Sequence, residues 1–88
     1  MSSIKKVAVI GTGVIGAGWI IRCLAHNKIV YAFDKDPKLK NSLIKEIKRT
    51  WPFVKKLFKK NKLNLKTFYY FTSLEKTLKD ADFIQECA

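Results

Sequence analysis

Cysteine, histidine and acidic residues are scarce in this 88-residue chain. Its two cysteines, Cys23 and Cys87, have no C-x-x-C spacing, and there is a single histidine. The sequence therefore predicts two buried, inert thiols, with neither a metal site nor a disulfide framework. No apolar run reaches the roughly 18 residues of a membrane-spanning helix, so we expect no membrane insertion. The length limits the chain to one small domain at most.

The shortage of acidic residues leaves a formal net charge of +11, which is unevenly distributed. Twelve Lys and Arg residues lie between positions 35 and 66, where the acidic residues are Asp36 and Glu46. Such a segment is typical of a solvated helix face, or of a surface that attracts polyanions or a phosphate-bearing substrate. We favour the solvated face, because net charge governs solubility and steering more than it defines a site. A basic nucleic-acid-binding module is the alternative from outside the enzymes.

The amino-terminal residues share one feature with a secretory signal. Lys5 and Lys6 precede the apolar segment 7–21, as in a signal peptide. That segment is interrupted by glycines, however, and no small-residue cleavage site stands out. We therefore expect a mature start and a cytoplasmic protein.

The segment 6–18, KVAVIGTGVIGAG, organises the chain. Four apolar residues that read as a strand lead into G-x-G-x-x-G, and a helix-like segment follows, which is the setting in which this motif binds a dinucleotide. There the first glycine allows a sharp turn, the second allows close approach of a pyrophosphate, and the third lets the helix pack on the strand. The helix N-terminus then offers N–H groups to the phosphates. The predicted phosphate-binding residues are Gly11, Thr12, Gly13, Val14, Ile15 and Gly16.

An acidic residue follows this motif at the spacing expected for ribose binding. Residues 29–33 read as a second strand, and Asp34 stands at its end, 23 residues after Gly11. A carboxylate about 20 residues after the motif is typical of the acid that hydrogen-bonds a ribose hydroxyl. Asp34 is therefore predicted to accept the ribose hydroxyls of NAD and to repel the 2′-phosphate of NADP, although Lys35 beside it would favour tolerance of NADP. The alternative is a glycine-rich turn with an acidic N-cap in another α/β protein.

Alternating strand-like and helix-like segments predict an α/β protein with a Rossmann-type parallel sheet of about four strands. The expected strand order is 3-2-1-4, which would leave strand four with an unpaired edge. We therefore expect residues 1–88 to be the amino-terminal part of a dinucleotide-binding domain, with a carboxy-terminal substrate domain absent. The expected strands are 4–10, 29–33, 68–71 and 83–87.

A helical hairpin is expected between strands two and three. Asp36 and Pro37 are typical of the N-cap and first position of a helix. Pro52 should end or kink that helix at Trp51, because proline lacks a backbone N–H and clashes with the preceding turn. A second helical piece over 53–60 would complete the hairpin.

Two other helices are expected. One spans 15–25, with Ile15 in its apolar stripe, and Asn27 after it tolerates the left-handed conformation of a helix end. The other is short and precedes strand four, where Thr72 and Glu75 form a capping-box pattern.

Several stretches resemble the amino-terminal NAD-binding domain of the 3-hydroxyacyl-CoA dehydrogenase family. They are VAVIGTGVIGAGW, the LAH turn and the strand ending in FDKDP. Three details are similar to the branch that oxidises the 3-hydroxyl of carnitine, with sugar-acid dehydrogenases next. These are Gly18–Trp19 after the motif, Trp51–Pro52, and DADFIQECA at residues 80–88. The resemblance covers essentially the whole chain.

The resemblance implies an NAD-dependent dehydrogenase, with the phosphate loop at 11–16 and the ribose-binding acid at Asp34. It implies a homodimer acting on a small-molecule substrate, with hydride passing from the 3-hydroxyl of carnitine to NAD. The family's catalytic His–Glu pair lies beyond strand four, so we assign no catalytic residue. Two alternatives stay open, a non-catalytic NAD-binding protein and oxidation of a 3-hydroxyacyl-CoA. In the second, the lysines available to CoA phosphates are Lys55, Lys56, Lys59 and Lys60.

Overall fold

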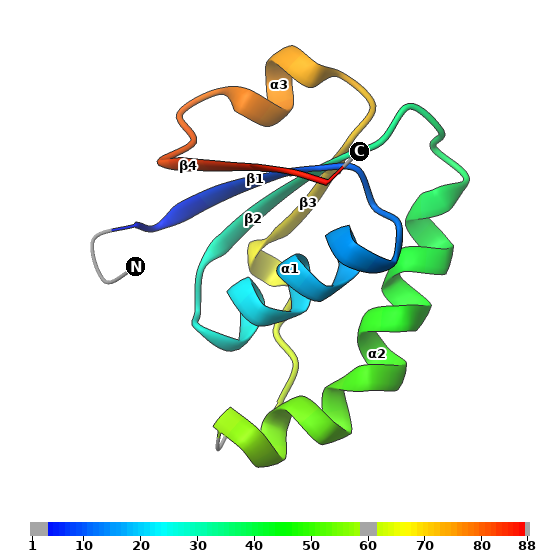
Figure 1. Cartoon of the computed structure of the whole chain (residues 1–88), viewed down its shortest axis with the longest axis vertical. Helices are drawn as coiled ribbons and strands as arrows, with labels where there is room; N and C mark the ends of the chain where they lie inside the picture. Colours follow the sequence, from blue (N-terminus) through cyan, green and yellow to red (C-terminus); the bar gives the residue numbers. More distant parts are fainter. Residues whose placement is uncertain (1–3, 59–61, 88) are drawn as a thin grey trace.

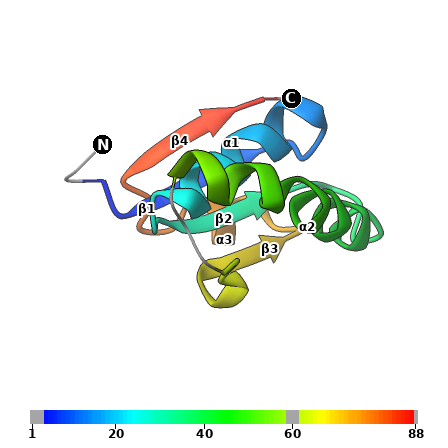
Figure 2. The same ribbon diagram turned by 90° about the horizontal axis from the view of Figure 1, so that it is seen from below.

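The computed structural model describes residues 4–58 and 62–87, which form one parallel four-stranded sheet with helices on both faces (Figure 1). The order across the sheet is β3-β2-β1-β4, as predicted, and Figure 2 shows the strands in this order. The predicted Rossmann-type fold class is therefore confirmed. The elements are β1 (Lys6–Ile10), α1 (Val14–Ala25), β2 (Ile29–Phe33), α2 (Leu39–Phe58), the 3-10 helix η1 (Leu65–Thr67), β3 (Phe68–Phe71), α3 (Leu74–Leu78) and β4 (Phe83–Glu86).

The main core lies between the sheet and the two longer helices, α1 and α2, which pack on the same face (Figure 1). Alternate strand residues point to this face, as the twofold period of a strand requires. Ala8, between Val7 and Val9, is also fully buried, so β1 is covered on both faces, as expected for a central parallel strand. The core residues are Val7, Val9, Ala17, Ile20, Ile21, Cys23, Leu24, Ala25, Val30, Ala32, Leu43, Ile47, Trp51 and Val54.

The second face of the sheet carries α3 and a cluster of aromatic rings. Tyr31 of β2 makes edge-to-face contacts with Tyr69 and Phe71 of β3, with ring centroids 5.2 Å and 5.3 Å apart. The parallel register of β2 and β3 pairs Tyr31 with Tyr69. Strand three therefore contributes its aromatic residues to sheet packing. Among the described residues, no helix combines the length and apolar character required to cross a membrane.

The predicted helical hairpin between strands two and three is wrong. Leu39–Phe58 is a single α-helix with Pro52 inside it, so the helix does not end at Trp51. Trp51 and Val54, on either side of the proline, are both buried in the core. We infer that their burial outweighs the cost of roughly 3 kcal/mol that an internal proline imposes. The kink, the other outcome predicted for Pro52, fits the change of direction that α2 shows in its last turns (Figure 1). The predicted continuation over 59–60 lies outside the described residues.

Several element ends also differ from prediction by one or two residues. β1 begins at Lys6 rather than at residue 4, and α2 begins at Leu39, after a turn in which Asp36 Oδ1 accepts a hydrogen bond from the Lys38 N–H at 2.8 Å. The N-cap of α3 is Ser73, not Thr72, because the Ser73 hydroxyl accepts from the backbone N–H of the third helical residue at 3.3 Å. Such shifts are ordinary at helix and strand ends.

Candidate functional site

A tight turn connects β1 to α1 at the glycine motif. Gly11 has a φ of 97°, which favours glycine, and its N–H donates to the Phe33 carbonyl at the end of β2 at 2.9 Å. A Cβ atom on Gly16 would collide with the Gly11 carbonyl oxygen, so the third glycine is required for the close approach of helix and turn. The local geometry predicted for the motif is therefore present.

The N-terminus of α1 is open. Its N-cap, Gly13, makes no side-chain capping hydrogen bond, and the first turn holds no acidic residue. A Cβ atom placed on Gly13 would meet nothing within 4 Å. Val14 and Ile15, the first helical residues, are 92% and 68% exposed. Ile15 therefore does not belong to the buried stripe of α1, contrary to prediction. The N–H groups of this turn and the positive end of the helix dipole remain available to an anion.

Asp34 lies across from this turn and faces it. Its Oδ2 accepts hydrogen bonds from the Thr12 hydroxyl at 3.0 Å and from the Thr12 N–H at 3.3 Å. β1 and β2 are parallel neighbours, with Ile10 opposite Phe33, so their carboxyl ends bring residues 11–13 and 34 together. The structure thus places the predicted ribose-binding carboxylate beside the predicted phosphate loop.

Hydrogen bonds keep the Asp34 carboxyl ionised. Partial burial acts to raise its pKa, but hydrogen bonds from Thr12 and from backbone N–H groups of residues 35–36 outweigh burial, so the pKa lies below its ordinary value. The Asp36 N–H reaches Asp34 Oδ1 at 3.4 Å. Lys35, next in the chain, is exposed. A negative charge therefore stands beside the loop throughout the neutral pH range.

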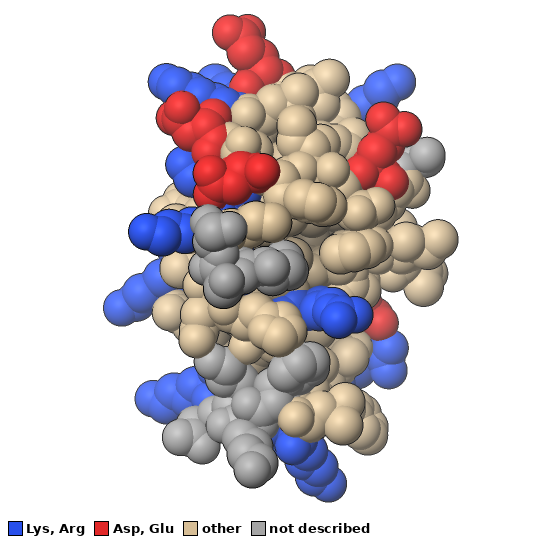
Figure 3. Space-filling view, turned by 60° about the vertical axis from the view of Figure 1, so that its left-hand side comes forward, with Lys and Arg blue, Asp and Glu red and all other residues tan. Residues whose placement is uncertain are grey.

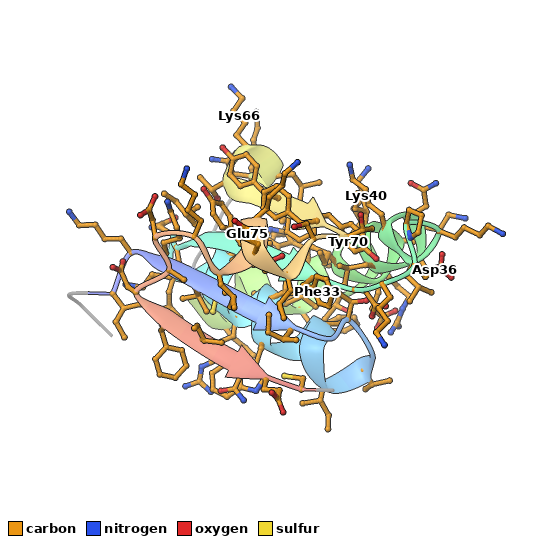
Figure 4. The ribbon with its side chains drawn as sticks, turned by 90° about the horizontal axis from the view of Figure 1, so that it is seen from above. Phe33, Asp36, Lys40, Lys66, Tyr70 and Glu75 are labelled. Carbon is orange, nitrogen blue, oxygen red and sulfur yellow. The ribbon has the colours of Figure 1, made fainter. Side chains whose placement is uncertain are left out.

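A tyrosine that the sequence analysis did not single out joins this group. The Tyr70 hydroxyl, on β3, donates to the Asp36 carbonyl at 2.6 Å, and Figure 4 shows both residues on neighbouring elements. β3 is the parallel neighbour of β2, with Tyr70 opposite Ala32, so its carboxyl end lies beside the residues that follow β2. The sequence could have indicated Tyr70 only by its position, because it lies near the carboxyl end of the strand that is expected next to β2.

Cys87 lies near the same loop, at the end of β4. Its N–H donates to the Ile10 carbonyl at 2.8 Å, and its Cβ is 3.8 Å from where a Cβ on Gly16 would stand. Cys87 is only partly buried, so the expectation of a buried thiol is not met here. It is confirmed for Cys23, where burial raises the pKa of the thiol.

A cavity of about 240 Å³ borders the loop on the side of α2. Its walls come from the start of α1 and the first turns of α2, so it is continuous with the open helix N-terminus. The lining residues are Thr12, Gly13, Val14, Ala17, Leu39, Ser42, Leu43 and Glu46.

Figure 3 shows Lys and Arg side chains separated by other residues on the face it displays. Arg49 and Glu46 form an ion pair at 2.6 Å on the exposed side of α2, where such a pair contributes little to stability. Lys59 and Lys60 lie outside the described residues. Within the described ranges, no group of three His, Cys, Asp or Glu side chains could hold a metal ion.

These residues fit a dinucleotide. An uncapped helix N-terminus with free space at Gly13 suits a pyrophosphate, and an ionised carboxylate across the turn suits the hydroxyls of a ribose. Asp34 also suits NAD better than NADP, because it would repel a 2′-phosphate. The single histidine, His26, is the C-cap of α1 and lies at the opposite end of that helix from the loop.

Comparison with known proteins agrees with this geometry. Residues 6–88 match the family model of the 3-hydroxyacyl-CoA dehydrogenase NAD-binding domain. The chain is 46% identical over 82 residues to L-carnitine dehydrogenase of Oceanobacillus iheyensis, covering 93% of this chain and 27% of the relative. It is 36% identical over 88 residues to L-carnitine dehydrogenase of a Pseudomonas species, covering 100% of this chain and 27% of the relative. The chain thus spans 27% of the length of these curated relatives.

A solved structure shares the fold. The 3-hydroxybutyryl-CoA dehydrogenase of Escherichia coli K12 superposes with a TM-score of 0.82 at 26% identity, over 98% of this chain and 19% of that one. The superposition therefore extends over nearly the whole chain.

Proposed function

The chain belongs to the 3-hydroxyacyl-CoA dehydrogenase family through its NAD-binding domain, and from this we propose that the protein is an NAD-dependent dehydrogenase that oxidises the 3-hydroxyl of carnitine. The choice of carnitine is supported by two relatives named L-carnitine dehydrogenase, at 46% and 36% identity. Because those relatives are much longer than this chain, the reaction is assigned to the protein as a whole.

The residues of this chain bind and orient the cofactor. NAD, when bound, accepts the hydride from the substrate carbon. The residues Gly11–Gly16 and the N-terminus of α1 would hold its pyrophosphate, and Asp34 would accept hydrogen bonds from a ribose. None of these groups moves a proton in the reaction, so the role proposed for them is to bind and orient the cofactor.

One observation carries the cofactor assignment. The first turn of α1 is uncapped and free of acidic residues, and the Asp34 carboxylate faces the same turn through Thr12. Here two complementary groups, one for phosphate and one for sugar, stand at the carboxyl ends of adjacent parallel strands, where such folds bind ligands.

A second candidate substrate is a 3-hydroxyacyl-CoA. It is favoured by the name of the family and by the E. coli structure, a 3-hydroxybutyryl-CoA dehydrogenase. Lys55 and Lys56 are exposed on α2, where they are available to CoA phosphates. Carnitine instead carries a quaternary ammonium and a carboxylate, so the two substrates require sites of different charge.

The oligomeric state and the class of substrate are proposed from the family resemblance, and the location is proposed from the pattern of the amino-terminal residues. We propose a homodimer that acts in the cytoplasm on a small-molecule substrate and binds no nucleic acid. Sedimentation of the purified protein would test the oligomeric state. A nucleic-acid-binding protein would instead show an affinity that falls steeply with salt concentration.

The cofactor assignment is tested by Gly13→Val in the full-length protein. The structure has room for a side chain at Gly13, so the variant should fold, but a valine there would occupy the position of the phosphates. NADH binding, followed by calorimetry, should be lost. Gly18→Val is the matched control, because a Cβ at Gly18 also meets nothing within 4 Å and lies a turn further along α1. Retained binding by a folded Gly13→Val variant would refute the phosphate-loop assignment.

The substrate assignment is tested separately, by NADH formation with L-carnitine or 3-hydroxybutyryl-CoA and NAD. Turnover of carnitine alone supports the proposal, and turnover of the CoA ester alone replaces it with the alternative. NADH binding without turnover of either would favour a non-catalytic NAD-binding protein.

A further inference from the structure

Tyr70 stands at the junction of three segments that build the candidate site. Its hydroxyl donates to the Asp36 carbonyl at 2.6 Å, while its ring packs against the core. The side chain therefore links β3 to the segment after β2 through a short hydrogen bond (Figure 4).

The segment that Tyr70 holds is the one that carries Asp34. The Asp34 N–H donates to the Phe71 carbonyl at 3.3 Å, so β3 also fixes the backbone on the amino side of this segment. The Asp36 N–H in turn reaches Asp34 Oδ1 at 3.4 Å. A displacement of Asp36 would thus be transmitted to the orientation of the Asp34 carboxylate.

The surroundings keep the Tyr70 hydroxyl protonated and hence a donor. Burial raises the pKa of Tyr70, the charges of Asp34 and Asp36 raise it further, and a hydrogen bond with Thr12 acts in the opposite direction. Tyr70 is therefore in electrostatic contact with Asp34 and near the hydroxyl of Thr12. These groups come from the loop after β1, the loop after β2 and β3.

We propose that Tyr70 is a positioning residue for the ribose of the dinucleotide: by holding the Asp36 carbonyl, it keeps the Asp34 carboxylate aimed at the site and so supports selection of NAD over NADP. This proposal rests on the proposed cofactor function. It predicts that loss of the Tyr70 hydroxyl changes the affinities for NADH and NADPH differently. A carboxylate that turns away both loses its hydrogen bond to the ribose of NAD and ceases to repel the 2′-phosphate of NADP. Loss of the hydroxyl should therefore weaken NADH and leave NADPH unchanged or strengthen it.

A merely structural role for Tyr70 predicts a different result. If the hydroxyl only stabilised the packing of β3, its removal would lower the melting temperature and weaken both cofactors by the same factor. The ratio of the two affinities therefore separates the roles. Tyr70→Phe is the suitable variant, because it retains the ring that packs against the core and removes only the hydroxyl.

The experiment compares Tyr70→Phe with Tyr69→Phe in the full-length protein. Tyr69 is the neighbouring strand residue, 45% exposed, and its ring packs against Tyr31 on the opposite face of the sheet. Dissociation constants for NADH and NADPH are measured by calorimetry. Tyr70→Phe should weaken NADH by roughly threefold to tenfold, as expected for one neutral hydrogen bond, and should reduce the preference for NADH by at least that factor. Tyr69→Phe should change neither. Equal effects on both cofactors, or no difference between the two variants, would overturn the proposal.

A double-variant cycle tests whether Tyr70 acts through Asp34. In the Asp34→Ala background, Tyr70→Phe should have no further effect on NADH affinity, because there is no carboxylate left to position. An additive effect would contradict the proposed route. A wild-type protein that binds no NADH would refute the proposed function itself. Normal NADH binding that Gly13→Val abolishes and Tyr70→Phe leaves unchanged would refute only this inference.

Discussion

The Thr12 hydroxyl donates to Asp34 Oδ2 at 3.0 Å and so joins the loop after β1 to the loop after β2. The Thr12 N–H reaches the same oxygen at 3.3 Å. These bonds hold the carboxylate on the side of the glycine turn, where the open end of α1 also points. The sugar-binding and phosphate-binding groups are therefore organised relative to each other by the protein alone.

Asp34→Ala should weaken NADH binding by about tenfold to a hundredfold, because a hydrogen bond to a charged group contributes roughly 1.5–3 kcal/mol. NADPH should lose much less affinity, since the variant also removes a charge that repels its 2′-phosphate. Titration calorimetry with both cofactors would measure the difference. Asp34→Asn is the control: it keeps an acceptor oxygen without the charge, so it should retain more NADH affinity than alanine. Equal losses for NADH and NADPH would remove the ribose assignment.

The glycine turn and Asp34 were predictable because their signals are local. A strand, a turn and a helix start within the residues 6–18, and the position of Asp34 follows from the strand that precedes it. The parallel pairing of β1 with β2 then brings the two signals together. The family resemblance rests partly on these same residues.

Two features were not predictable, because they depend on packing across the molecule. Pro52 carries a strong local signal for a helix end, but the burial of Trp51 and Val54 keeps α2 continuous. The bond from Tyr70 to Asp36 joins residues 34 positions apart, and only the register of β3 against β2 places the hydroxyl there. The exposure of Ile15 also depends on packing, since Gly16 and Ala17, which follow it in the first turn of α1, are buried.

Gly16→Ala and Gly18→Ala should change stability in opposite directions, although both add one methyl group to α1. A Cβ at Gly16 collides with the backbone of Gly11, which cannot move without opening the turn, so we expect a loss of about 1–3 kcal/mol. A Cβ at Gly18 meets nothing within 4 Å, and alanine is the better helix former by up to ~1 kcal/mol. Urea denaturation of the two variants would measure both effects. Shifts of the same sign would show that the turn is looser than its geometry indicates.

Asp82 should make the stability of the protein depend on pH. Its Oδ2 accepts the backbone N–H groups of Lys6 and Lys5, each at 3.0 Å, and so ties the start of β4 to the start of β1. The hydrogen bonds from Lys6 and Lys5 lower the pKa of Asp82 below its ordinary value. A group whose pKa is lower in the folded state stabilises the fold above its unfolded pKa, about 3.9. This contribution is lost as the pH falls through the folded pKa.

Asp82→Ala should therefore be less stable than the wild type at neutral pH, and the difference should narrow towards pH of about 3. Urea midpoints for both proteins across this range would test the expectation. Glu75→Gln, which changes an exposed carboxylate on α3, is the control and should follow the wild type. A difference between Asp82→Ala and the wild type that stays constant with pH would mean that the carboxylate charge does not matter here.

Replacing Asn27 by glycine should leave the stability of the protein unchanged, whereas replacing it by alanine should lower the stability. It has a φ of 61° at the end of α1, where its N–H donates to the Leu24 carbonyl at 3.1 Å and the Lys28 N–H donates to the Cys23 carbonyl at 3.0 Å. This pair of bonds is the Schellman pattern, which requires a left-handed residue. Alanine in that conformation costs roughly 1–2 kcal/mol, whereas glycine adopts it freely. Asn27→Ala should thus lower the urea midpoint and Asn27→Gly should not. Asn27 lies at the end of α1 away from the glycine turn, so neither variant should alter NADH affinity while the protein remains folded. A selective loss of NADH binding in Asn27→Gly would show that the two ends of α1 are coupled.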